Sequence, residues 1–308
     1  MIDNQEVAVI GLGPSGVTAS IYLKRFGMTP VPFEREQVGG QVDKTEQIEN
    51  YPGFPIIKGP ELGQEFEKHL AKFSIEPIYT EVSKITRMED GNFHVEYGLG
   101  KSRDFHYVIL ASGLSPTDFH IPGEDAYQGR GFSRCAICDG PFYKGKEVAV
   151  IGAGNSAFEE ASYLASLCSH VTLIARRTQF RAAKASVDRF TAFPNTTLLA
   201  PYDIVGSAGT KKVESLTLKN KENGEEKTVP VSGVFLYVGE KAETSLLRIP
   251  GLTDEKGYLV TDENMETKAK NLYATGDIRV KNLRQVATAV NDGAIAATAI
   301  HQDYQESK

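Results

Sequence analysis

Residues 6–16, EVAVIGLGPSG, and residues 147–157, EVAVIGAGNSA, begin with the same six letters. In each copy a short apolar run rich in β-branched residues predicts a buried parallel strand, and the glycines after it predict a tight turn into a helix. Glycines at this spacing, between a strand and a helix, are typical of a dinucleotide-binding unit. The two copies therefore predict an α/β protein with two Rossmann-like, three-layer nucleotide-binding domains.

The first copy has every feature of this motif. Its turn is formed by Gly11, Gly13, Pro14, Ser15 and Gly16. The three glycines allow the tight turn, the close approach of a pyrophosphate and the close packing of helix on strand. A helix over residues 17–27, stopped by Gly27, should lead to a second strand that ends at Glu34. The carboxylate of Glu34 would then accept hydrogen bonds from ribose hydroxyls.

The second copy ends differently. Its turn is formed by Gly152, Gly154, Asn155, Ser156 and Ala157. Where the first unit ends in Glu34, the strand over residues 170–175 ends in Arg176 and Arg177, with Arg181 a turn further on. Guanidinium groups hold a 2′-phosphate through charge-assisted, often bidentate bonds. The first site therefore suits a nucleotide with a free ribose and the second suits NADP, unless the arginines are only a solvated strand end.

A cysteine pair, Cys135 and Cys138, lies just ahead of the second copy in the stretch CAICDG. A zinc site would need two more ligands, and the candidates Cys168 and His170 are poorly spaced within residues 161–170, which predict a helix. An iron–sulfur cluster would need four cysteines, and the chain has three. A chance pair is a further alternative. We favour a redox-active dithiol, in which one thiolate attacks a disulfide and the other resolves it.

Asp139 directly follows the cysteine pair. Because no histidine lies nearby in the sequence, Asp139 is the candidate acid or base that moves the thiol proton. The alternative is a simple turn residue in Asp-Gly-Pro. The third cysteine, Cys168, is expected to be an inert core residue.

Composition narrows the class of protein. The 308 residues carry a net charge of −6, which argues against a general affinity for nucleic acid or anionic membrane. There is no apolar run of about 18 residues, so no membrane span is expected. The N-terminal stretch MIDNQEVAVIG lacks a basic region followed by a longer apolar core, so we expect a cytoplasmic protein rather than a secreted one.

Over nearly its whole length the chain resembles the low-molecular-weight, bacterial-type thioredoxin reductases. Five stretches carry the resemblance: GLGPSG (11–16), VGGQVDKTEQIENYPGFP (38–55), CAICDGPFYKGKEVAVIGAGNSAFEEA (135–161), IARRTQFRA (174–182) and LYATGDIRVKNLRQVATAVNDGAIAA (272–297). Two departures are Ala175, where the family usually has histidine, and residues 239–243, where it usually has Gly-x-x-Pro-Asn.

The resemblance implies FAD at the first site and NADPH at the second. It adds a set of flavin-contact residues to the first motif: Arg35, Gly39, Gly40, Gln41, Val42, Asn50, Ala111, Gly276, Asp277, Arg284, Gln285 and Val286. Among these, the glycines offer a backbone free of Cβ bulk, and Asp277 would bind the polyol or phosphate region of FAD.

The order of the motifs implies a discontinuous FAD domain, residues 1–116 and 244–308, with an NADPH domain inserted at residues 117–243. The resemblance further implies a homodimeric thioredoxin-disulfide reductase that passes electrons from NADPH through FAD and the cysteine pair to a thioredoxin-like protein. Because flavin and dithiol belong to different domains, we expect the inserted domain to rotate between two poses. Two alternatives stay open: a ferredoxin-linked flavoprotein of the same architecture, and a non-enzymatic nucleotide or redox sensor.

Overall fold

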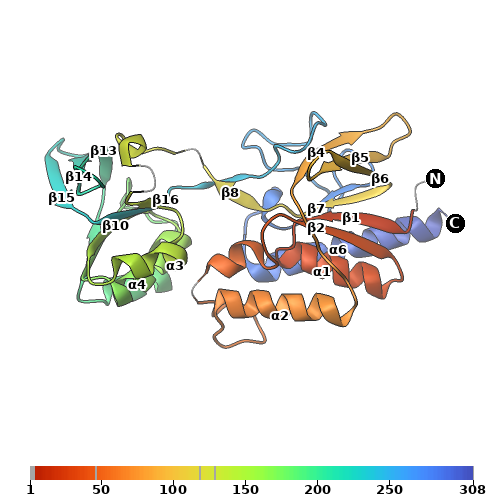
Figure 1. Ribbon diagram of the computed structural model, residues 1–308, viewed down its shortest axis with the longest axis horizontal. Helices are drawn as coiled ribbons and strands as arrows, with labels where there is room; N and C mark the ends of the chain where they lie inside the picture. Colours follow the sequence, from red (N-terminus) through yellow and green to blue (C-terminus); the bar gives the residue numbers. More distant parts are fainter. Residues whose placement is uncertain (1–3, 46, 118, 128–129, 308) are drawn as a thin grey trace. The chain divides into compact units, whose positions relative to one another are not determined.

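The structure is a computed structural model that describes residues 4–45, 47–117, 119–127 and 130–307. The chain divides into two compact units (Figure 1). Unit 1 comprises Met1–Ser115 and Lys241–Lys308, and unit 2 comprises Pro116–Glu240. Unit 2 is therefore inserted into a discontinuous unit 1, in line with the order of the motifs. The expected domain boundaries at 116/117 and 243/244 stay a prediction.

A parallel sheet of five strands forms the centre of unit 1 within the described residues. In sheet order its strands are β18 (Leu272–Ala274), β7 (Tyr107–Leu110), β1 (Glu6–Ile10), β2 (Thr29–Glu34) and β3 (Ile78–Tyr79). Successive residues of a strand face opposite sides of the sheet, so a strand buried on both sides must be apolar throughout. β1 meets this requirement, because every residue from Val7 to Ile10 is buried.

Helices cover one face of this sheet and a small antiparallel sheet covers the other (Figure 1). The helices on the sheet are α1 (Pro14–Arg25) and α6 (Val286–Glu306), and α2 (Gly59–Lys72) packs against α1. The strands β4 (Val82–Arg87), β5 (Phe93–Tyr97) and β6 (Lys101–Phe105) lie opposite. Val7 and Val9 of β1 pack in one apolar cluster with α1 and α6. Ala8 and Ile10 pack in a second cluster with β4, β5 and β6. Unit 1 thus has three layers.

Unit 2 repeats this arrangement. Its parallel sheet has the order β12 (Thr196–Leu199), β11 (His170–Ile174), β10 (Glu147–Gly152), β16 (Gly233–Tyr237) and β9 (Phe132–Ser133). The covering elements are α4 (Asn155–Leu167) and α5 (Lys184–Thr191) on one face, with β13 (Tyr202–Ala208), β14 (Ser215–Asn220) and β15 (Glu226–Pro230) on the other. Val148 and Val150 of β10 pack with the helices, and Ala149 and Ile151 pack with the small sheet. The predicted pair of Rossmann-like domains is confirmed.

One helix boundary differs from the sequence prediction. The expected helix over residues 161–170 ends at Leu167, and Cys168 is its C-terminal cap. His170 begins β11, as the strand predicted over residues 170–175 requires, and pairs with Glu147 of β10. The helix must stop early because β11 needs these residues to run beside β10 over its whole length.

The two chain crossings between the units lie side by side. β8 (Leu114–Pro116) pairs with β17 (Glu240–Ala242) in a two-stranded sheet. Backbone hydrogen bonds continue on either side of this pair, from the Glu243 amide to the Gly113 carbonyl oxygen and from the Thr117 amide to the Gly239 carbonyl oxygen, both 3.1 Å. None of the described helices is long and apolar enough to cross a membrane.

Close packing of α1 on α6 depends on Gly293. A Cβ atom at this position would lie 2.1 Å from the Ser15 carbonyl oxygen, so the two helices approach by backbone contact. Such a contact cannot accommodate even one methyl group without moving a helix.

We therefore expect Gly293→Ala to lower the free energy of unfolding of unit 1 by about 1–3 kcal/mol. Thermal unfolding followed by circular dichroism measures the change. Gly206→Ala is the matched control, since the nearest atoms to its added Cβ are 3.8 Å away in ordinary contact. Equal unfolding temperatures for both variants would contradict the close approach of α1 and α6.

Candidate functional site

The first glycine turn lies at the carboxyl end of β1 and is closed by backbone contacts. Gly11 has φ +95°, and a Cβ there would lie 2.7 Å from the Ala111 carbonyl oxygen at the end of β7. A second pair, Gly39 (φ +116°) and Gly40 (φ +58°), approaches the same turn, with a Cβ on Gly40 falling 3.4 Å from Gly13 Cα. The structure thus brings the predicted glycines together in a cradle that side chains would fill.

Glu34 ends β2 beside this cradle and is buried. Its two carboxylate oxygens accept hydrogen bonds from the backbone amides of Leu12, at 2.7 Å, and of Glu36, at 2.9 Å. Each oxygen keeps a further lone pair for a ribose hydroxyl. The neighbouring Arg35 is exposed and forms an ion pair with Glu36. The role of Glu34 as a ribose ligand stays a prediction.

The closing stretch places a buried, unpartnered carboxylate oxygen in unit 1. Asp277 lies in the short 3₁₀ turn Gly276–Ile278 after β18, and its Oδ1 has no hydrogen-bond partner among the described residues. Burial raises the pKa of Asp277, while the charges of Lys281 and Arg284 oppose the shift. The buried Oγ1 of Thr275, a residue not singled out from the sequence, is unpartnered in the same way. Buried polar atoms of this kind need a hydrogen-bond partner, which a hydroxyl group of a bound ligand would supply.

The remaining predicted flavin residues are held by contacts within unit 1. Arg284 donates to the Asp277 carbonyl oxygen at 3.2 Å and lies over the ring of Tyr258. Gln285 caps α6 and accepts a hydrogen bond of 2.8 Å from Asn50, although the two residues are 235 positions apart.

Three more of these residues lie at the edges of the same cradle. Gln41 donates to the Leu114 carbonyl oxygen at 3.1 Å. Val42 and Val286 pack in one apolar cluster with α2. The glycine cradle, the buried acceptors and these edge residues together fit a dinucleotide with a polyhydroxyl chain, as in FAD.

The second glycine turn, in unit 2, is tight at its start and open at the helix. A Cβ on Gly152 would lie 2.6 Å from the Tyr237 carbonyl oxygen and 2.7 Å from Ala157 Cβ. Gly154 caps α4 and has open space around it, and Ser156 is exposed in the first turn. The first turn of α4 contains no acidic residue. Its free amide groups and the helix dipole therefore favour an anion such as a nucleotide phosphate.

The segment after β11 folds back onto this turn. The Arg181 amide donates to the Ala153 carbonyl oxygen at 2.9 Å. Arg176, Arg177 and Arg181 all have exposed side chains. Arg176 also forms an ion pair with Asp203 at 2.6 Å, which the sequence did not reveal. The exposed guanidinium groups of Arg177 and Arg181 are therefore the better candidates for a 2′-phosphate.

Asn155 supports the same fold-back. Its side-chain oxygen accepts a hydrogen bond of 2.7 Å from the Ala183 amide, at the start of α5. Asn155 thus connects the second glycine turn to the end of the arginine segment, residues 176–181. This role is in addition to any contact with a nucleotide.

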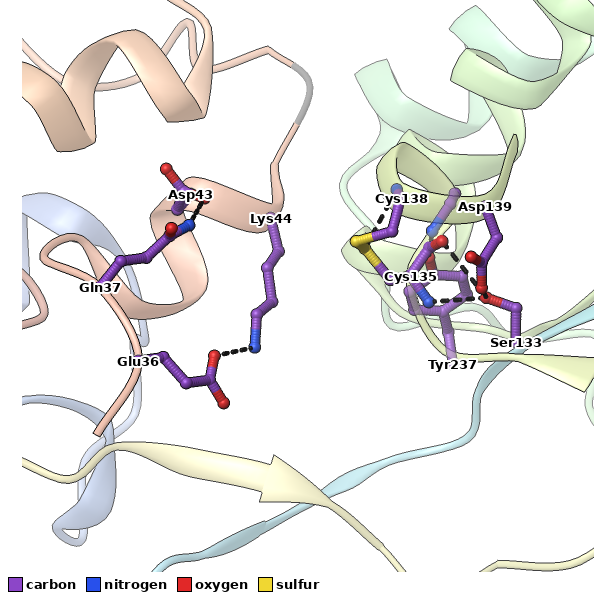
Figure 2. The surroundings of a disulfide bond; sticks show 10 residues. Glu36, Gln37, Asp43, Lys44, Ser133, Cys135, Cys138, Asp139 and Tyr237 are labelled. Atoms are coloured by element: carbon purple, nitrogen blue, oxygen red, sulfur yellow. Dashed lines mark hydrogen bonds and ion pairs between the residues drawn. A yellow bond between two sulfur atoms is a disulfide. The ribbon is translucent and has the colours of Figure 1, made fainter. Parts of the chain in front are cut away.

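Cys135 and Cys138 of unit 2 form a disulfide bond (Figure 2). Cys135 caps the short helix α3 (Ala136–Asp139), and its Sγ accepts a hydrogen bond of 3.2 Å from the Cys138 amide. Cys138 is exposed, whereas Cys135 is partly buried. The predicted pairing is confirmed, and Cys138 is the more exposed of the two residues.

Two hydroxyl groups hold the backbone next to this disulfide (Figure 2). Ser133 Oγ donates to Asp139 Oδ2 at 2.6 Å and accepts from the Cys135 amide at 3.1 Å. Tyr237 Oη accepts from the Ala136 amide at 2.9 Å. Burial raises the pKa of Tyr237, so its hydroxyl stays neutral. Neither residue was predicted, because Ser133 belongs to no recognisable motif and Tyr237 lies about a hundred positions away.

The third cysteine plays no part in this centre. Cys168 is buried in the apolar cluster of α4, and burial raises the pKa of its thiol to about 11. Within the described ranges, no group of three or more His, Cys, Asp or Glu side chains could hold a metal ion. The expectation that Cys168 is a core residue is confirmed.

Comparisons with known proteins agree with this arrangement. The chain matches the family model described as pyridine nucleotide-disulphide oxidoreductase over residues 5–293. It is 39% identical over 312 residues to a thioredoxin reductase of Bacillus subtilis, covering 98% of this chain and 95% of the relative. A solved thioredoxin reductase of Lactococcus lactis has a TM-score of 0.94 and 35% identity, covering 98% of this chain and 99% of that one. One from T. acidophilum has a TM-score of 0.91 and 31% identity, with coverages of 98% and 99%.

Thiol reactivity should follow from these environments. In the native, oxidised protein we expect a thiol reagent to label no cysteine rapidly, because two form the disulfide and Cys168 is buried. Mild reduction should release two reactive thiols, and the third should appear only on unfolding. The absorbance of the group that the reagent releases gives the number of reacted thiols at each stage. A rapidly reacting thiol in the native oxidised protein would contradict the burial of Cys168.

Proposed function

This chain belongs to the pyridine nucleotide-disulphide oxidoreductase family, and we propose that it acts as a thioredoxin reductase with FAD as prosthetic group and NADPH as electron donor. The observation that carries the proposal is the Cys135–Cys138 disulfide, whose exposed Cys138 lies in the same unit as a dinucleotide turn. Tyr237 joins the two features, since its carbonyl packs on Gly152 and its hydroxyl binds the Ala136 amide.

Each cofactor is assigned to one unit. The glycine cradle of unit 1 and the unpartnered oxygen of Asp277 support FAD there. In unit 2, the free helix start at Gly154 and the exposed side chains of Arg177 and Arg181 support NADPH. When bound, FAD accepts a hydride from NADPH and passes the electrons on to a disulfide.

The protein's own redox group is the cysteine pair. Its disulfide takes up two electrons and two protons and opens to two thiols. One thiolate then attacks the disulfide of thioredoxin and forms a mixed disulfide with it, which frees one thioredoxin thiol. The other cysteine attacks the mixed disulfide, so that the Cys135–Cys138 bond forms again and thioredoxin leaves with both thiols reduced. We assign to Asp139 the transfer of one of the protons, because Ser133 binds both its carboxylate and the Cys135 amide.

The related alternatives are less well supported. A ferredoxin-linked enzyme would not need the open glycine turn and the exposed arginines of unit 2, and the named relatives above are thioredoxin reductases. A sensor without turnover is less well supported because the relatives named above are enzymes. By family likeness and composition we further propose a cytoplasmic homodimer whose protein partner is thioredoxin, with no nucleic-acid or membrane partner.

Substitution of either cysteine tests the electron path. We expect Cys135→Ser and Cys138→Ser each to lose thioredoxin reduction, because one thiol alone can neither re-form the disulfide nor resolve the mixed one. NADPH should still bleach the flavin absorbance of both variants under anaerobic conditions, because the dithiol acts after the flavin.

Cys168→Ala is the matched control and should keep turnover with thioredoxin. Thioredoxin reduction at the normal rate by Cys135→Ser or Cys138→Ser would contradict the proposed electron path. Failure of NADPH to bleach the wild-type flavin would instead favour another electron donor, such as ferredoxin.

The arginine segment should determine the preference of unit 2 for NADPH over NADH. Loss of a charge-assisted contact to the 2′-phosphate costs roughly 1.5–3 kcal/mol, or about 10- to 150-fold in affinity. We expect Arg177→Ala to weaken NADPH binding by about this factor and to leave NADH binding unchanged. Titration with each nucleotide measures both affinities.

Arg248→Ala, an exposed arginine in unit 1, is the control and should change neither affinity. An unchanged preference for NADPH in Arg177→Ala would show that this arginine does not bind the 2′-phosphate.

A further inference from the structure

Ser133 occupies a fixed position at the edge of the unit 2 sheet. It is the last residue of β9, pairs with Phe235 of β16, and is only 8% exposed. The strand therefore fixes its Cα, and the surrounding protein limits its side chain. A hydroxyl held in this way contributes to the geometry of whatever it binds.

The Ser133 hydroxyl connects the Asp139 carboxylate to the backbone of Cys135. The donor–acceptor distance to Asp139 Oδ2 is 2.6 Å, which is typical of a hydroxyl donating to a charged oxygen. The Cys135 carbonyl oxygen lies further away, at 3.2 Å, and competes less well for the single proton. A lone pair of the same Oγ accepts the Cys135 amide at 3.1 Å.

None of these contacts involves a sulfur atom. The disulfide can therefore open and close without breaking them, unlike the hydrogen bond from the Cys138 amide to Cys135 Sγ. Ser133 can thus keep the Asp139 carboxylate linked to the backbone of Cys135 in both oxidation states. One carboxylate oxygen is engaged by the hydroxyl, and the other lies outside this bond.

We propose that Ser133 is a positioning residue of the redox centre, whose hydroxyl holds the Asp139 carboxylate in place to exchange a proton with the cysteine pair. This inference rests on the proton-transfer role assigned above to Asp139.

A second hydroxyl provides a comparison within the same loop. The amides of Cys135 and Ala136 are consecutive, and each donates to one side-chain hydroxyl, of Ser133 or of Tyr237. If these hydroxyls only supported the loop, their removal would have similar effects. Only the Ser133 hydroxyl also binds the Asp139 carboxylate.

The test is a double-mutant cycle on the holoenzyme, with turnover of thioredoxin by NADPH as the readout. We expect Asp139→Asn to slow turnover by about 100-fold or more, the usual contribution of an acid–base group. Ser133→Ala should slow it by about tenfold, and Ser133→Thr, which keeps the hydroxyl, should restore most of the rate. In the Asp139→Asn variant, Ser133→Ala should not slow turnover any further, because a positioning residue acts only through the group it holds.

Tyr237→Phe is the matched control. It removes the hydroxyl that binds the Ala136 amide, so its effect should multiply with that of Asp139→Asn instead of vanishing. Bleaching of the flavin by NADPH should remain at the wild-type rate in all variants, which verifies that each one is folded and loaded.

Three outcomes decide between the possibilities. If Ser133→Ala slows Asp139→Asn as much as it slows the wild type, Ser133 acts through the backbone and the proposal is overturned. If Asp139→Asn turns over normally, the role of Asp139 is wrong and the proposal falls with it. If the wild type does not reduce thioredoxin, the proposed function fails. The same double-mutant cycle, measured on the rate at which dithiothreitol opens the Cys135–Cys138 disulfide, then still decides the role of Ser133.

Discussion

The central strand of each unit is buried on both faces, and the rest of the unit depends on this burial. β1 and β10 present alternate residues to opposite sides, so each needs an apolar layer above and below it. Val7 and Val9 pack against helices, and Ala8 and Ile10 against a small antiparallel sheet. The same division applies in unit 2. The same strand sequence therefore lies at the centre of the same three-layer arrangement in both units.

This burial also determines where chemistry can occur. A strand covered on both faces offers only its ends to a ligand, and the glycine turns lie at the carboxyl ends of β1 and β10. In unit 1 the cradle is closed by a second glycine pair from a distant segment. In unit 2 the turn stays open at α4, and the arginine segment folds back onto it. One motif thus produces two different sites.

The redox centre depends on groups that lie outside any motif. The disulfide is local in sequence, but its loop is held by the edge strand that carries Ser133 and by Tyr237 of β16. Tyr237 also packs on the glycine turn through its backbone. Tyr237 therefore contacts both the disulfide loop and the nucleotide turn within unit 2.

The sequence by itself determined the repeated fold and the local motifs. Strand, turn and helix follow from residues near one another, and so do the glycine positions and the Cys135–Cys138 pair, because period, chain stiffness and spacing are local properties. Only the tertiary structure decided which distant groups meet. The bond of Asn50 to Gln285, the ion pair of Arg176 with Asp203 and the early end of α4 depend on strand pairing and packing over long separations. No local pattern encodes such contacts, since any of several surface residues could have filled them.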